Sequence, residues 1–224
     1  MAGTTRLDTL LIPLVVCVVA LVVCALLNPP VVAAVNSIGL GIQSATELQP
    51  LLMGIVIAVV VGILLTLPTS SAAICISIGL GGLAGGAAVV GCASHMIGFA
   101  VASYKDNGIS GVISQGLGTS MLQIPNVLKK PLILLPAVIA SAIVGPIATV
   151  GFQLACTATG AGMGTAGLVG VFGVIEASQN IMNSTQLWTA IILLMFVLPA
   201  IIAWSVAYMM RRLGWIVAGD MKLP

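Results

Sequence analysis

Hydrophobic residues run in long blocks along this chain, and short polar stretches separate the blocks. The blocks cover residues 9–27, 51–67, 72–102, 131–154 and 187–210. A helix needs about 20 mostly apolar residues to cross a bilayer, and only helices and closed barrels can cross it. The pattern therefore predicts an all-α, polytopic integral membrane protein with about six to seven spans plus re-entrant or broken helices.

Other apolar stretches are interrupted before they reach that length. Residues 29–44 contain proline, asparagine and glycine, so we expect a short or re-entrant helix there. Residues 157–177 are apolar, short and rich in glycine, and we expect a re-entrant segment. Block 72–102 holds two overlapping pairs of small residues that allow close backbone approach, which are Gly81, Gly82, Gly85 and Gly86. The pattern leaves open whether this block forms two short helices or one span plus a broken one.

Most of the polar residues in the middle of the chain lie in one central segment, residues 105–130. A helix through this segment would place Gln115, Thr119 and Gln123 on one face. Two nearby glycines weaken such a helix, and Pro125 ends it. A polar, broken segment among membrane spans usually lines a cavity, because bare backbone at that depth must be buried in protein or meet water. The central segment is therefore the candidate site.

Composition excludes a soluble domain. Apolar residues make up 60% of the chain and charged residues only 5%, and the mean hydropathy is +1.26; a globular domain carries about 25% charged residues. The net charge of +2 is too small to predict binding to nucleic acid. The five cysteines stand singly in apolar runs, so we expect no metal site, no disulfide and no cofactor.

Basic residues predict the orientation of a single transmembrane domain that covers residues 1–224. Arg211 and Arg212 follow the last apolar block and place the tail, residues 211–224, in the cytoplasm. Lys105 and the pair at 129–130 are expected on the same side.

A short sequence echo connects the central segment with residues 157–177. Gly116-Leu117-Gly118-Thr119-Ser120 recurs as Gly162-Met163-Gly164-Thr165-Ala166. Paired glycine-interrupted segments in corresponding positions are typical of transporter sites. A five-residue match in a glycine-rich chain also arises by chance, so both interpretations stay open.

Two ionisable residues, His95 and Glu176, stand in strongly apolar surroundings. Such a group at membrane depth is a candidate functional residue, here a catalytic one. The simpler interpretations are a buried neutral imidazole bonded to a carbonyl, and a glutamate at the membrane surface. Most of the polar candidates are amides and hydroxyls, which favour a neutral polar solute over a cation. The candidate binding residues are Asp106, Asn107, Gln115, Gly118, Thr119, Ser120, Gln123, Asn126, Gly164 and Thr165.

The motifs resemble those of a known family. The run from Gly116 to Asn126, with Lys105-Asp106-Asn107 before it and the run from Gly160 to Thr165 after it, is similar to bacterial phosphotransferase-system sugar permeases of the enzyme IIC type. That family includes a proposed regulator of a clostridial toxin. The resemblance implies a homodimer in the bacterial plasma membrane that binds a sugar. A separate phosphorylated IIB protein would modify that sugar.

The resemblance also implies site residues and raises an alternative. Related permeases hold a glutamate and a histidine beside the sugar, roles that Glu176 and His95 would fill here. Permeases of this kind are usually longer than 224 residues, so we expect a shortened member. Two functions therefore compete, namely a sugar permease without a self-contained catalytic centre, and a membrane sensor or regulator that keeps the fold without transport.

Overall fold

The computed structural model describes residues 15–19, 21, 32–33 and 37–223. Most of the first expected span, residues 9–27, and part of the expected short helix at 29–44 lie outside these residues. The described residues of that span, 15–19 and 21, are helical. The described chain is helical apart from turns, short extended pieces and one isolated bridge between Gly82 and Cys156. The prediction of an all-α fold is confirmed.

The N-terminal half of the described chain contains residues 37–48, which are helical, and the helices α2 (Pro50–Thr66), α3 (Ser71–Ser77), α4 (Gly82–Ala102) and α5 (Tyr104–Ile113). The central segment continues through η1 (Ser114–Gly118), η2 (Ser120–Gln123) and α6 (Ile124–Lys129). The rest consists of η3 (Pro131–Leu134), α7 (Leu135–Pro146), η4 (Ile147–Gly151), α8 (Ala158–Ala161), η5 (Ala166–Leu168), α9 (Val169–Ser178), α10 (Ser184–Ala190), η6 (Ile191–Val197) and α11 (Leu198–Arg212).

Three helices of the described chain are long and apolar enough to cross a membrane. They cover Gly82–Ala102, Pro131–Gly151 and Ser184–Arg212, and the last two include π-helical turns. Each matches an apolar block of the sequence. Helix α2 is apolar but has 17 residues, slightly short of the usual length. The chain is an integral membrane protein.

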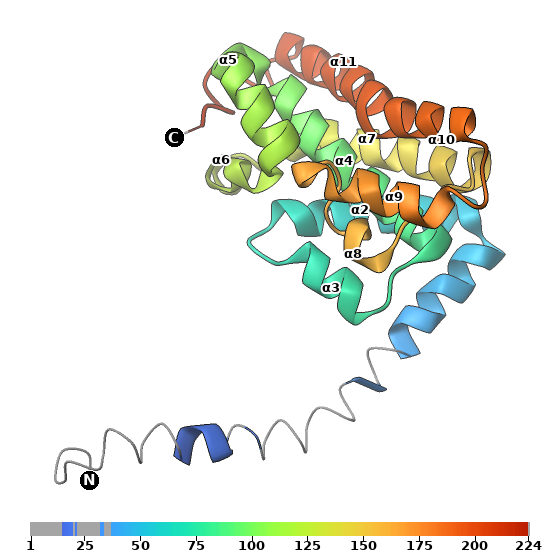
Figure 1. Cartoon of the computed structure of the whole chain (residues 1–224). Helices are drawn as coiled ribbons and strands as arrows, with labels where there is room; N and C mark the ends of the chain where they lie inside the picture. Colours follow the sequence, from blue (N-terminus) through green and yellow to red (C-terminus); the bar gives the residue numbers. More distant parts are fainter. Residues whose placement is uncertain (1–14, 20, 22–31, 34–36, 224) are drawn as a thin grey trace, which may run out of the picture.

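Helix α4 is the central helix of the bundle. It packs against α2, α7 and α11, and Figure 1 shows it between α11 and α2. Nearly all of its residues are buried. Glycines make this possible, because a side chain at Gly91 would collide with the backbone of Ala58 in α2, and one at Gly86 with the carbonyl of Leu154. Of the four glycines predicted to allow close approach, Gly85 and Gly86 lie tightly against the backbone of residues 154–156, whereas Gly81 and Gly82 do not make such contacts.

Block 72–102 divides into the short α3 and the long α4. Gly79 and Gly82 both have φ of +60°, a conformation that glycine adopts without strain. The chain turns there, so the second interpretation, one span plus a broken one, describes this block. Residues 157–177 contain α8, η5 and most of α9. Helix α8 packs against α3 and α4, α9 packs against α8 and α4, and η5 packs against η1.

Candidate functional site

The central segment is not one continuous helix. Its π-helical turn ends at Gly118, Thr119 is extended with φ of −160° and ψ of 142°, and a 3₁₀ turn follows. The expected single face of Gln115, Thr119 and Gln123 is therefore wrong in its geometry. The Thr119 hydroxyl instead accepts a hydrogen bond from the backbone N–H of Met121 and starts the 3₁₀ turn.

Three amide side chains of the segment nevertheless form one hydrogen-bonded chain, which we call the amide chain. Gln123 Nε2 donates to Gln115 Oε1 at 2.9 Å, and Asn126 Nδ2 donates to Gln123 Oε1 at 2.9 Å. Gln115 Nε2 donates to the hydroxyl of Ser103 at 2.8 Å. Gln115 and Gln123 are fully buried. The break at Thr119 thus brings the two glutamines together by folding the segment back on itself.

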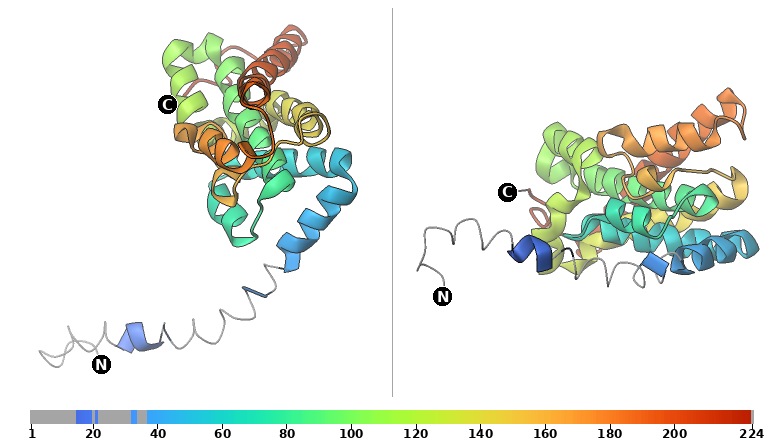
Figure 2. Two further views of the ribbon diagram at one scale, coloured as in Figure 1. Left: turned by 45° about the vertical axis from the view of Figure 1, so that its right-hand side comes forward. Right: turned by 60° about the horizontal axis from the view of Figure 1, so that its bottom comes forward.

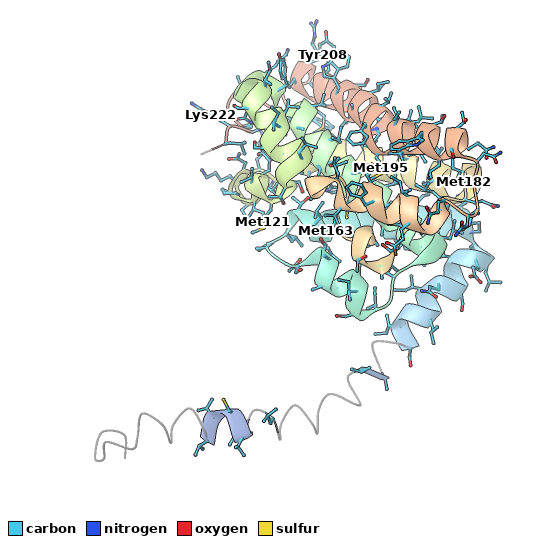
Figure 3. All side chains as sticks on the ribbon, viewed as in Figure 1. Met121, Met163, Met182, Met195, Tyr208 and Lys222 are labelled. Carbon is cyan, nitrogen blue, oxygen red and sulfur yellow. The ribbon has the colours of Figure 1, made fainter. Side chains whose placement is uncertain are left out.

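The chain's own C-terminal tail lies against this segment. Gln123 and Asn107 both donate to the carbonyl of Met221, and Asn126 donates to that of Lys222. Asp106 bonds Arg211 at 2.7 Å. Figure 3 shows Lys222 at the end of the molecule that carries Tyr208, with Met182 at the opposite end.

A second polar cluster connects the central segment with the core. The Thr66 hydroxyl lies 3.0 Å from His95 Nδ1 and 3.1 Å from the Ser120 hydroxyl, and all three residues are buried. His95 Nε2 and the hydroxyl of Ser94 have no hydrogen-bond partner in the described chain. Thr66 also lines a cavity of about 100 Å³ between α2 and α6, together with Ile63, Leu67, Pro68, Ile124, Val127, Leu128 and Leu134.

The two halves of the sequence echo are in contact. The Thr165 hydroxyl donates to the carbonyl of Gly116 at 2.6 Å, and η1 packs against η5. The π-helical turn ends two residues later, so this carbonyl is one of the groups that a helix terminus leaves without an internal partner. Gly164 has φ of +56°, and a side chain there would meet the backbone of Cys92 and Ala93 in α4.

Two of the candidate residues stay apart from these clusters. Glu176 is exposed on α9, and among the described residues no hydrogen bond or ion pair connects it with His95. Gly118 is exposed, with open space around its Cα. Neither joins the amide chain or the cluster around Thr66.

Sequence reasoning missed three residues that these clusters use, namely Thr66, Ser103 and Met221. Thr66 is a hydroxyl at the end of an apolar block, directly before Leu67 and Pro68, and this isolated polarity was the available signal. The seating of the tail has no local signal, because it depends on contacts across more than 90 residues.

Charge gathers at one end of the molecule. Six of the seven lysines and arginines, all except Arg6, lie in α5, at the ends of α6 and α11, and in the tail. Lys130 donates to Asp220 at 2.6 Å, and this hydrogen bond lowers the pKa of the Asp220 carboxyl. In the described chain no group of three His, Cys, Asp or Glu residues is placed to hold a metal ion.

Comparison with known proteins gives one match. Neither a curated protein nor a solved structure matches the chain. The family model described as "Phosphotransferase system, EIIC" matches residues 1–223. This range includes the amide chain, the cluster around His95 and the echoed motifs. The chain belongs to the phosphotransferase-system EIIC family.

Proposed function

We propose that the chain is the sugar permease component of a phosphoenolpyruvate-dependent phosphotransferase system. It binds a sugar and carries it across the bacterial plasma membrane, while a separate phosphorylated IIB protein supplies the phosphoryl group. Membership of the EIIC family supports the general role. The sugar, the IIB partner and the homodimer are part of the proposal.

The observation that carries the proposal is the buried cluster of Ser120, Thr66 and His95. Polar groups at membrane depth are costly, and those kept there usually serve a solute path. The cluster joins the echoed motif, through Ser120, to an imidazole nitrogen that has no partner in the described chain. Gly62 of α2 packs against the imidazole in this structure, so a sugar hydroxyl would supply the missing partner once α2 moves away from the ring.

The chemistry needs few groups from the chain itself. Phosphoryl transfer depends mostly on positioning and charge stabilisation. The bond from phosphorus to the IIB side chain breaks as the bond to the sugar oxygen forms, and the proton of that hydroxyl must go to a base. We assign this role to His95, with Glu176 as the exposed alternative at the membrane surface. Asn, Gln, Ser and Thr side chains of the central segment and Thr165 bind the other hydroxyls.

The proposed topology places the basic end in the cytoplasm. Positive residues near span ends are enriched on that side, and six of the seven gather there. The proposal keeps one transmembrane domain over residues 1–224, about six to seven spans and a re-entrant segment at 157–177. The IIB protein would then approach α5, α6 and the tail.

Transport in proteoliposomes tests the proposal. Purified protein is reconstituted, and accumulation of labelled hexoses is measured with and without phosphorylated IIB. Thr66→Ala removes the hydroxyl that holds His95, so we expect uptake to fall roughly tenfold or more. Thr189→Ala is the matched control, because among the described residues the hydroxyl of the exposed Thr189 bonds only the carbonyl of Thr185. Equal uptake by wild type, Thr66→Ala and Thr189→Ala would remove His95 and Thr66 from the proposed site.

The second candidate function is a membrane sensor that binds a solute without transporting it. The seated tail favours it, because it connects the central segment with a cytoplasmic end through Met221 and Lys222. Binding of a hexose without uptake, with phosphorylated IIB present, would select the sensor.

A further inference from the structure

The C-terminal tail, residues 213–223, follows α11 and returns across α5 and α6. It turns at Gly214, which has φ of +74°, and the N–H of Trp215 donates to the carbonyl of Met210. Both views in Figure 2 show the C-terminus beside the green helices of the central segment. The tail contains no regular helix after Arg212.

Side chains of the central segment bind the backbone of the tail. Asn107 makes two bonds, donating from Nδ2 to the carbonyl of Met221 at 2.7 Å and accepting from the N–H of Leu223 at 2.8 Å. Asp106 Oδ1 accepts from the N–H of Gly219 at 3.0 Å. The tail forms consecutive turns over residues 218–221, and side chains that pair with its backbone N–H and C=O groups bind it as a groove binds a peptide.

The amide chain takes part in the same recognition. Gln123 Nε2 donates to the carbonyl of Met221 at 2.9 Å, and Asn126 Nδ2 donates to that of Lys222 at 2.9 Å. The tail therefore occupies donors of the side chains that the proposed function assigns to sugar hydroxyls. A sugar and the tail would compete for these donors.

Two apolar side chains fix the position of the tail. Ile216 is 2% exposed and Met221 is fully buried. Both belong to a core cluster with Phe99, Ile133, Ala137, Ala207 and Met210. The groove thus provides an apolar pocket and a polar rim, as a peptide-binding groove does.

An ion pair at the rim joins the tail to the end of α6. Lys130 and Asp220 lie 2.6 Å apart, with their side chains 31% and 24% exposed. Asp220 also accepts from the N–H of Val217, and so shapes the turn of the tail. A partly exposed pair contributes little to stability, so its removal should loosen the tail while the bundle stays folded.

We propose that residues 213–223 form a reversible strap in a peptide-binding groove made by Asp106, Asn107, Gln123, Asn126 and Lys130, and that the strap must leave before a sugar binds there. The second half rests on the proposed function. The first half does not, because it concerns only the chain's recognition of its own tail.

Hydrogen exchange of the purified full chain tests the strap. Lys130→Gln and Asp220→Asn each remove the ion pair, and Lys129→Gln is the matched control, because Lys129 is exposed and holds no tail atom in the described structure. We expect amides of residues 217–223 to exchange roughly two- to fivefold faster in the first two variants than in wild type and the control. Equal protection in all four proteins would overturn the strap.

A labelled peptide with the sequence of residues 213–223 tests the groove. The peptide keeps its aspartate, so it can pair with Lys130 of a chain whose own tail is loosened. We expect it to bind Asp220→Asn roughly two- to fivefold more tightly than wild type, and more tightly than Lys130→Gln. A scrambled peptide is the control. If the peptide binds wild type and both variants with equal affinity, or if the scrambled peptide binds as tightly as the native one, the proposed groove is wrong.

Binding of labelled hexoses tests the competition. We expect the best-binding hexose to bind Asp220→Asn roughly two- to fivefold more tightly than wild type and Lys129→Gln. Faster exchange of the tail with unchanged hexose affinity would overturn the competition and leave the proposed function intact. Failure of every hexose to bind any variant would overturn the proposed function and the competition together, while exchange and peptide binding still decide the strap.

Discussion

At the scale of single residues, His95 shows how closely the core is fitted around its polar groups. The imidazole lies against Gly62 of α2, where a Cβ would meet the ring and the carbonyl of Gly91. The position of His95 in an apolar run identified it as a candidate, but its partner is the Thr66 hydroxyl and not a backbone carbonyl. The hydrogen-bond partner of His95 depends on how α2 crosses α4, and no local sequence pattern predicts that crossing.

Gly62→Ala is expected to destabilise the protein by about 1–3 kcal/mol, because it overpacks the contact between α2 and His95. Thermal unfolding in detergent measures the effect. Gly41→Ala serves as the control, since nothing lies within 4 Å of the Cβ it would add. A midpoint for Gly62→Ala as high as that of the control would contradict the described packing.

Asn126→Ala is expected to weaken hexose binding while the protein still inserts and folds. The change removes a donor to Gln123 and to the tail at a position that is only half buried. Its expected effect on stability is about 0.5–1.5 kcal/mol. Equilibrium binding measures the affinity, and size-exclusion chromatography checks folding. Unchanged affinity would remove Asn126 from the site.

At the scale of elements, the lengths of the apolar blocks predicted the long helices well and the broken helices poorly. The helix Ser184–Arg212 extends a few residues beyond the predicted block at both ends. The central segment breaks at Thr119 because a π-helical turn ends there and Thr165 takes up the carbonyl of Gly116. The position of the tail could not be predicted from the sequence. The hydrogen bond between Asn107 and Leu223 joins residues that are far apart in the chain and come together only when it folds.

The tail is also expected to respond to acid. The Lys130 hydrogen bond lowers the pKa of Asp220 in the folded protein, so the stabilisation is present above the ordinary pKa of aspartate, which is about 3.9. It is lost as the pH falls through the lower, folded value. Protection factors of tail amides, corrected for intrinsic exchange, should therefore fall below about pH 4. Asp220→Asn should lack this change, and the same fall in that variant would exclude Asp220 as its cause.

At the scale of the whole molecule, the distribution of charge predicts the orientation. The basic residues gather at the end formed by α5, α6 and the tail, which predicts that this end faces the cytoplasm. A C-terminal fluorescent reporter that folds only in the cytoplasm should therefore be bright. A dark reporter on a protein that is fully inserted would reverse the orientation and move the proposed IIB surface to the wrong side.

The central claim is that the polar clusters of this bundle carry a sugar across the membrane for phosphorylation. Uptake of labelled hexoses into proteoliposomes, with phosphorylated IIB on the side of the basic end, measures this directly. The account predicts that one hexose accumulates in phosphorylated form only when IIB is present, and that Thr66→Ala loses this while Thr189→Ala keeps it. Equal, unphosphorylated uptake with and without IIB, or no uptake of any hexose, would contradict it.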